Sequence, residues 1–134
     1  MRNSSKKAAK RSREAKPIRD EYRHMYPYCQ RADCDRVGTD IHEIARGPAR
    51  QQAISERACL LHLCREHHDE LGDYSQWPIA RQLALKKWAD RPGYDRQRVN
   101  EIRGRDPEAI SELEVNGWYA PYLDDEWESI TAQW

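Results

Sequence analysis

Four side chains with sulfur or nitrogen donors stand in two closely spaced pairs. Four residues separate Cys29 from Cys34, and two separate Cys64 from His67. Residues this close in a tight loop or at a strand-to-helix junction can direct both side chains at one ion, and two such pairs complete a tetrahedron. The spacing therefore predicts a structural zinc ion held by Cys29, Cys34, Cys64 and His67.

A second set of metal-binding side chains remains once these four are assigned. His42 lies between Asp40 and Glu43, and His68 directly follows His67. Because neighbouring helical residues point about 100° apart, His67 and His68 are expected to serve different ions, or one of them is expected to serve none. Imidazole and carboxylate groups together hold divalent cations that activate water. The set therefore predicts a second, catalytic metal site.

A loop, two strands and a helix must bring these side chains together. The sequence predicts a tight loop over residues 28–38 and a strand over residues 39–44, where apolar and polar residues alternate. An apolar strand is expected over residues 59–64, followed by a helix over residues 65–71 that ends at Gly72. The expected order is loop, strand, loop, strand, helix.

Other elements are expected around this unit. Residues 49–58 are polar and predict a structured loop, and three helices are expected to begin at Pro17, Pro78 and Asp95. Cys59 begins the second apolar strand, where a small buried thiol fits well, and we interpret it as structural.

Charge is distributed unevenly along the 134-residue chain, although 23 basic and 23 acidic residues give a net charge of zero. Residues 1–24 carry nine basic and three acidic side chains, whereas residues 107–134 carry seven acidic and no basic ones. We therefore expect a basic, disordered arm over residues 1–16, a domain over residues 17–106 and an acidic, aromatic-rich tail over residues 107–134. The tail is expected to pack on the domain or on a protein partner.

The composition limits the class of protein. Hydrophobic residues make up 38% of the chain and charged residues 34%. The roughly 80 residues from about Arg23 to Arg105 can form only a small core, and a bound metal would compensate for this. No apolar run approaches the length of a membrane span, and four cysteines without a secretory signal favour metal binding over disulfides. We expect a cytoplasmic protein without a membrane partner.

Residues 22–90 resemble the HNH endonuclease family, particularly its small phage-type members. The matching stretches are CQRADCDRVGTDIHEIARGPAR, which begins at Cys29, and LLHLCREHHDELGDYSQWPIARQLALKKW, which begins at Leu60. The resemblance implies an α+β fold in which zinc knuckles stabilise a ββα-metal core with flanking helices. It also implies hydrolysis of DNA phosphodiester bonds with a divalent ion such as Mg²⁺, Mn²⁺, Ni²⁺ or Zn²⁺.

The resemblance assigns the same zinc ligands as the spacing does. Cys29, Cys34 and Cys64 match the zinc cysteines of the family, and His67 stands in place of the usual fourth cysteine. Cys59 lies about where the middle asparagine of the family motif is usual, so this chain lacks that asparagine.

The resemblance also implies roles at the catalytic centre. His68 matches the ion ligand on the helix, and in strict register His42 matches the ligand on the first strand and Glu43 the general base. Two arrangements fit. Either Glu43 accepts the proton of the attacking water, or His42 does so while Asp40 or Glu43 helps to hold the ion.

DNA is the partner that the resemblance implies. Arg46, Arg50, Arg57 and the basic arm are expected to neutralise phosphates while the helix of the ββα unit lies against the backbone. No segment is typical of a base-reading helix, so sequence preference is expected to be weak. For a phage protein, genome processing in the host cytoplasm would follow.

Two alternative functions fit the same sequence. The chain could be a non-catalytic zinc module that binds nucleic acid through its arm or a protein through its tail. The acidic tail could also mimic DNA and cover the active face of its own domain.

Overall fold

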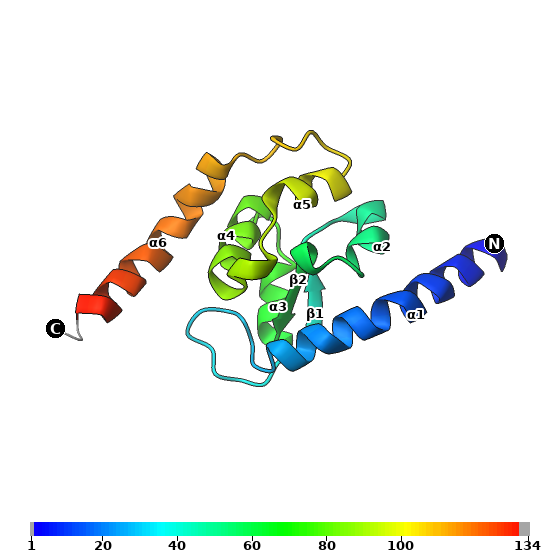
Figure 1. The fold of residues 1–134 in the computed structure, drawn as a ribbon, viewed down its shortest axis with the longest axis horizontal. Coiled ribbons are helices and arrows are strands. Elements are labelled where there is room, and N and C mark those ends of the chain that lie inside the picture. The colour runs from blue at the N-terminus through cyan, green and yellow to red at the C-terminus, as the bar shows by residue number, and fades with distance from the viewer. Residues whose placement is uncertain (1, 132–134) are drawn as a thin grey trace.

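The computed structural model describes residues 2–131, with side-chain detail for residues 6–123. This part of the chain forms six α-helices, three short 3-10 helices and a two-stranded antiparallel sheet, an α+β arrangement. In Figure 1, helices α1 and α6 extend in different directions from a central body that holds the sheet, so the first turn of α1 lies far from the last turn of α6. None of the helices in this part is long and apolar enough to cross a membrane.

The sheet and the helix that follows it form a ββα unit. Strands β1 (Asp40–Glu43) and β2 (Leu60–Leu63) pair so that His42 lies opposite Leu61. Helix α3 (Arg65–Leu71) begins directly after Cys64. The predicted strands and helix are confirmed, and each strand is one residue shorter at either end than expected.

Helix α1 (Arg2–Met25) differs from the sequence expectation. The expected disordered arm and a helix that begins at Pro17 are replaced by one continuous helix with Pro17 in its interior. Residues 6–16 are mostly Ala, Lys, Arg and Glu, which have high helix propensity. The side chain of Ala15 is fully buried, so the helix also contacts the body at this residue, whereas residues 6–14 are exposed.

The segment between the strands is helical rather than a loop. It contains η1 (Gly47–Ala49), α2 (Arg50–Ala53) and η2 (Arg57–Cys59). Ala53 has no exposed surface, which anchors this polar segment to the core.

Helices α4 (Ile79–Ala89) and α5 (Arg96–Ile102) follow the ββα unit, with η3 (Arg91–Gly93) between them. The expected cap of α5 is confirmed, because the Asp95 side chain accepts a hydrogen bond from the backbone N–H of Arg98.

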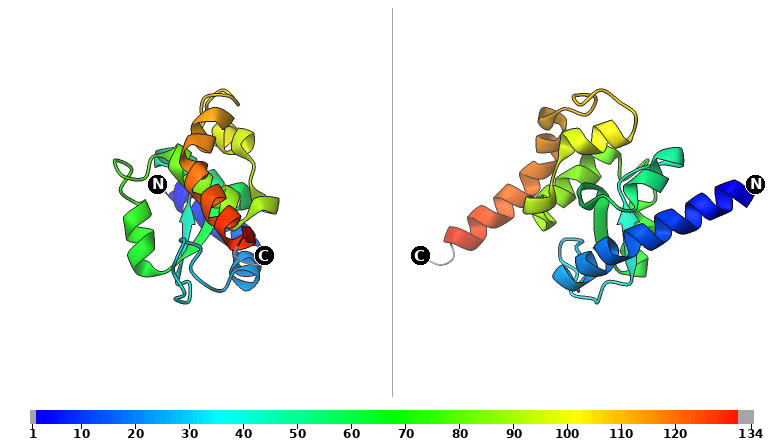
Figure 2. Two further views of the ribbon diagram at one scale, coloured as in Figure 1. Left: turned by 90° about the vertical axis from the view of Figure 1, so that its left-hand side faces the viewer. Right: turned by 45° about the vertical axis from the view of Figure 1, so that its right-hand side comes forward.

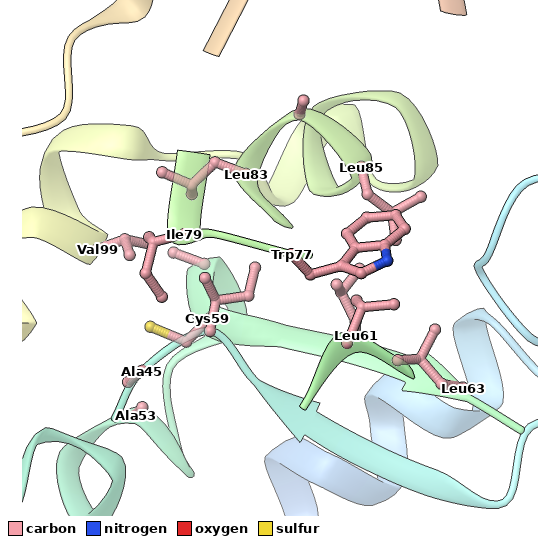
Figure 3. Close-up of a cluster of buried hydrophobic side chains, with 14 of the residues drawn as sticks. Ala45, Ala53, Cys59, Leu61, Leu63, Trp77, Ile79, Leu83, Leu85 and Val99 are labelled. Atoms are coloured by element: carbon pink, nitrogen blue, oxygen red, sulfur yellow. The ribbon is translucent and has the colours of Figure 1, made fainter. Parts of the chain in front are cut away.

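The hydrophobic core lies between β2, α4 and α5. Figure 3 shows side chains from β2 and α4 meeting around Trp77, with Cys59 at one edge. Cys59 has no exposed surface and belongs to this cluster, as its structural interpretation requires. The fully buried aliphatic side chains of the cluster include Leu61, Leu63, Leu83, Leu85 and Val99.

Helix α6 (Glu112–Thr131) packs on α4 through its first half. Val115 and Tyr119 are buried, and the rings of Trp88 and Tyr122 stack at a centroid distance of 5.3 Å. Figure 2 shows α6 running beside α4 and then beyond the body. The tail was expected to pack on the domain or on a partner, and Val115, Tyr119 and Tyr122 do pack on the domain. The side chains of residues 124–134 lie outside the described part.

A buried charge cluster joins α1, β2 and α4. The ammonium group of Lys86, which has no exposed surface, donates to Asp90 at 2.7 Å, to the backbone carbonyl of Leu60 at 2.8 Å and to the Tyr22 hydroxyl at 3.0 Å. Arg57 reaches the same carboxylate with two hydrogen bonds, of 2.8 and 3.2 Å. Each buried charge is thus paired, as low-dielectric surroundings require.

Candidate metal centres

The first pair of sulfur ligands lies in a hairpin-like loop between α1 and β1. A backbone bridge between Tyr28 and Val37 closes the loop, and Cys29 follows Tyr28 directly. A Cβ atom at Gly38 would lie 2.6 Å from the ring of His62, so only glycine allows the loop to pack this closely on β2. The loop thereby carries Cys29 to the end of the sheet.

The second ligand pair lies where β2 passes into α3. Cys64 precedes the helix and His67 lies in its first turn. The His67 Nδ1 atom is 3.3 Å from the Cys64 Sγ atom and 3.4 Å from the Cys29 Sγ atom. In a tetrahedral zinc site, with Zn–S about 2.3 Å and Zn–N about 2.1 Å, a sulfur and a nitrogen ligand lie about 3.6 Å apart.

The cluster of Cys29, Cys34, Cys64 and His67 is complete. Its four ligand atoms lie within 4.8 Å of one another, so the expected ligand set is brought together. Cys29 and Cys64 are buried, and burial raises the pKa of the Cys29 thiol to about 11. A cation among these sulfurs would favour their thiolate forms, and three thiolates with one imidazole suit a metal such as zinc.

The other histidine of α3 points to a different site. His68 Nδ1 lies 3.3 Å from the Nδ1 atom of His42 on β1, with the two rings edge to face. The expected divergence of His67 and His68 is therefore confirmed. Two imidazole nitrogens bound to one tetrahedral ion at about 2.1 Å each would lie about 3.4 Å apart. The separation of the two Nδ1 atoms fits a shared ion.

Gln82 of α4 fixes the protonation pattern of His42. Its amide nitrogen donates to the backbone carbonyls of Leu71 at 3.0 Å and Trp77 at 2.8 Å. Its amide oxygen therefore faces the His42 Nε2 atom at 2.7 Å and must accept a hydrogen bond from it. The neutral His42 ring then carries its proton on Nε2, and its Nδ1 lone pair is directed at His68.

Burial keeps this ring neutral. Desolvation lowers the pKa of His42 to about 4, with a smaller contribution from the charge of His68, while the hydrogen bond to Gln82 opposes the shift. At neutral pH the Nδ1 atom of His42 is thus available as a metal ligand or proton acceptor.

A pocket of about 390 Å³ opens beside the histidine pair. Glu43 and Asp69 line it together with Arg46 and Arg50. Glu43 is 8% exposed, and its carboxylate pairs with Arg19 at 3.1 Å and with Arg50 at 3.7 Å. The guanidinium of Arg46 stacks over the ring of Tyr74 at 4.3 Å and carries no carboxylate partner among the described residues.

Two of the expected site residues are held elsewhere. Asp40 pairs with Arg65 at 3.2 Å and does not complete a group of three metal ligands with His42 and His68 within the described side chains. Arg57 is bound to the buried Asp90 and does not line the pocket. Sequence reasoning also missed Gln82, although a glutamine among the apolar residues of α4 was a signal.

No family model, curated protein or solved structure matches this chain. The site is therefore interpreted from its own geometry.

Proposed function

We propose that the chain is a metal-dependent DNA endonuclease or nickase of the HNH type, serving phage genome processing. The observation that carries this proposal is the pair of Nδ1 atoms of His42 and His68, 3.3 Å apart at the edge of a pocket with two arginines. The position of this histidine pair supports an HNH-like site. One histidine lies on the first strand and the other on the helix of a ββα unit, and the unit also carries a Cys/His cluster.

In this proposal His42 and His68 hold a divalent ion, and the arginines bind the substrate. A bound divalent ion would polarise the scissile phosphate and stabilise the leaving oxygen. Arg46 and Arg50 line the same pocket and would neutralise the phosphate oxygens and orient the phosphate in the pocket. Gln82 keeps the Nδ1 lone pair of His42 directed at the site.

We assign the role of proton acceptor to Glu43. With the Nδ1 atom of His42 committed to the ion, Glu43 is the residue in the family's general-base position, and it lines the same pocket. Arg19 pairs with its carboxylate at 3.1 Å and holds it at the pocket, where it would accept the proton of a bound water.

The proposal is tested by nicking of supercoiled plasmid with Mg²⁺, Mn²⁺ or Ni²⁺, combined with ion binding by calorimetry. Wild type is expected to nick. His42→Ala should lose both nicking and binding of the second ion, whereas Glu43→Gln should bind the ion and nick about 100-fold more slowly or worse. His24→Ala, at an exposed histidine of α1, is the matched control and should behave as wild type. Unchanged nicking by Glu43→Gln would contradict its assignment.

A non-catalytic zinc module is the second candidate. It is favoured by the absence, among the described side chains, of a third protein ligand for the ion at His42 and His68. This candidate predicts one zinc per chain and no nicking with any divalent ion. An inhibitory cover by the tail is not supported within residues 112–123 of α6, because none of these residues lines the pocket.

A further inference from the structure

A second pocket of about 510 Å³ adjoins the histidine pocket and is lined mainly by arginines. Arg46 contributes from the segment after β1, and Arg103 and Arg105 contribute from the end of α5. Arg46 and Gly47 line both pockets, so the two pockets lie next to each other at these residues. The views in Figures 1 and 2 place the end of α5 beside the segment that leads into α2.

The turn that ends α5 sets the positions of Arg103 and Arg105. Gly104 adopts a left-handed conformation with φ of 72°, and its N–H donates to the carbonyl of Glu101 at 2.9 Å. The N–H of Arg105 donates to the carbonyl of Asn100 at 3.0 Å. This pair of bonds is the common glycine-dependent helix end. It fixes the backbone on both sides of Gly104, so the two arginines are held at one pocket rather than on a mobile tail.

These three arginines have no carboxylate partner among the described residues. Within residues 6–123, the hydrogen bond that the Arg103 guanidinium makes is a 3.5 Å contact with the side chain of Asn100. The nearby acidic groups are engaged elsewhere, since Glu101 pairs with Arg98 at 3.4 Å and Asp106 accepts from the N–H of Glu108 at 2.8 Å.

The positive charges of Arg46, Arg103 and Arg105 are not balanced by a negative charge among the described residues. Burial and, next, the charge of Arg105 lower the pKa of Arg103, which places two like charges close together. Favourable placement of cations at a helix C-terminus explains Arg103 and Arg105 in part. It does not explain Arg46, which comes from another segment of the chain. An anion in the pocket would relieve the repulsion between Arg103 and Arg105 and would also give Arg46 a negatively charged partner.

We propose that Arg46, Arg103 and Arg105 form a subsite for a backbone phosphate of DNA, next to the phosphate that lies at the histidine pair. The choice of DNA rests on the proposed function. A nucleic-acid backbone is favoured because Arg46 and Gly47 line both pockets, so successive phosphates of one strand can occupy the two pockets together. The subsite adds two residues to the DNA contacts that the sequence indicated.

The test measures binding of a fluorescent DNA duplex by anisotropy across a salt series, with the full chain, zinc present and no catalytic ion. Arg105→Gln is expected to weaken binding about tenfold and to reduce the slope of log K against log salt by about 0.9, one phosphate contact. Arg103→Gln combined with Arg105→Gln should weaken binding further. Lys87→Gln also removes one positive charge, from α4, but neither Lys87 nor its partner Glu112 lines either pocket, and this control should keep the wild-type slope.

Three results would overturn the subsite. One is a wild-type slope in both Arg105→Gln and the double variant, and another is an equal loss of affinity and slope in Lys87→Gln. The third is a thermal shift with inorganic phosphate that depends on Arg105 without any change in DNA binding, which would assign the pocket to free phosphate. Plasmid nicking decides the nuclease proposal separately. Nicking with unchanged salt slopes would reject the subsite alone, and altered slopes without nicking would reject the nuclease alone.

Discussion

Replacing Gln82 by Met tests how the histidine pair is positioned. Methionine keeps the length and approximate volume of the side chain but removes its three hydrogen bonds, to Leu71, to Trp77 and to the His42 ring. Gln82 has no exposed surface, so water does not replace the lost partners. Gln82→Met therefore leaves two carbonyls and one imidazole N–H with fewer partners in the core.

The expected effect has two parts. Each buried group that loses its partner costs about 1–3 kcal/mol, and apolar packing of methionine offsets some of this, so the free energy of unfolding should fall by about 2–5 kcal/mol. The His42 ring also loses the acceptor that holds its proton on Nε2. Loss of such an orienting partner typically lowers metal affinity 10- to 100-fold, and we expect this for the ion at His42 and His68.

Urea unfolding measures the first effect, and calorimetric titration of the zinc-loaded, folded variant with Ni²⁺ measures the second. Gln97→Met is the control, because Gln97 bonds to Glu108 on the surface, and it should change stability by less than about 0.5 kcal/mol. Wild-type Ni²⁺ affinity in a folded Gln82→Met chain would refute the positioning role of Gln82.

Three further predictions concern the zinc cluster, the buried histidine and the charge cluster. Cys64→Ser should reduce zinc content from one ion per chain to nearly none and lower the unfolding free energy by at least about 3 kcal/mol, whereas equal zinc content by elemental analysis would contradict the cluster. The pKa of His42 is lower in the folded protein than in the unfolded chain. The neutral His42 ring therefore makes its full contribution to the unfolding free energy above about pH 6.5, and this contribution is lost as the pH falls through about 4. The stability difference between wild type and His42→Gln in urea should therefore shrink by about 3 kcal/mol from pH 7 to pH 4, and a constant difference would be inconsistent with the shift. Asp90→Ala leaves the buried ammonium of Lys86 unpaired and should cost about 3–5 kcal/mol in urea unfolding, against less than about 0.5 kcal/mol for the exposed Asp20→Ala; equal effects would show that the pairing is unimportant.

Local patterns in the sequence predicted the ββα unit and its ligands well. Paired metal ligands must lie close in sequence on each knuckle, so the spacing of Cys64 and His67 already contained the geometry that the structure shows. Apolar alternation and the stop at Gly72 located β1, β2 and α3 to within one residue at each end.

Features that depend on distant contacts could not be predicted. Arg57 was expected to face DNA, but its partner Asp90 lies 33 residues further along the chain. The pocket formed by Arg46 and Arg105 likewise joins segments that only the fold brings together. Helix α1 continues through Pro17 toward Arg2 with Ala15 buried on the body, a contact that the composition of an isolated arm does not reveal.

The most direct test of the histidine pair as a nuclease centre compares wild type with His68→Ala in plasmid nicking, with both proteins carrying one zinc per chain. We predict that wild type converts supercoiled plasmid to the nicked form with a divalent ion and that His68→Ala does so at least about 100-fold more slowly. Equal rates for the two proteins would contradict the assignment of catalysis to this pair.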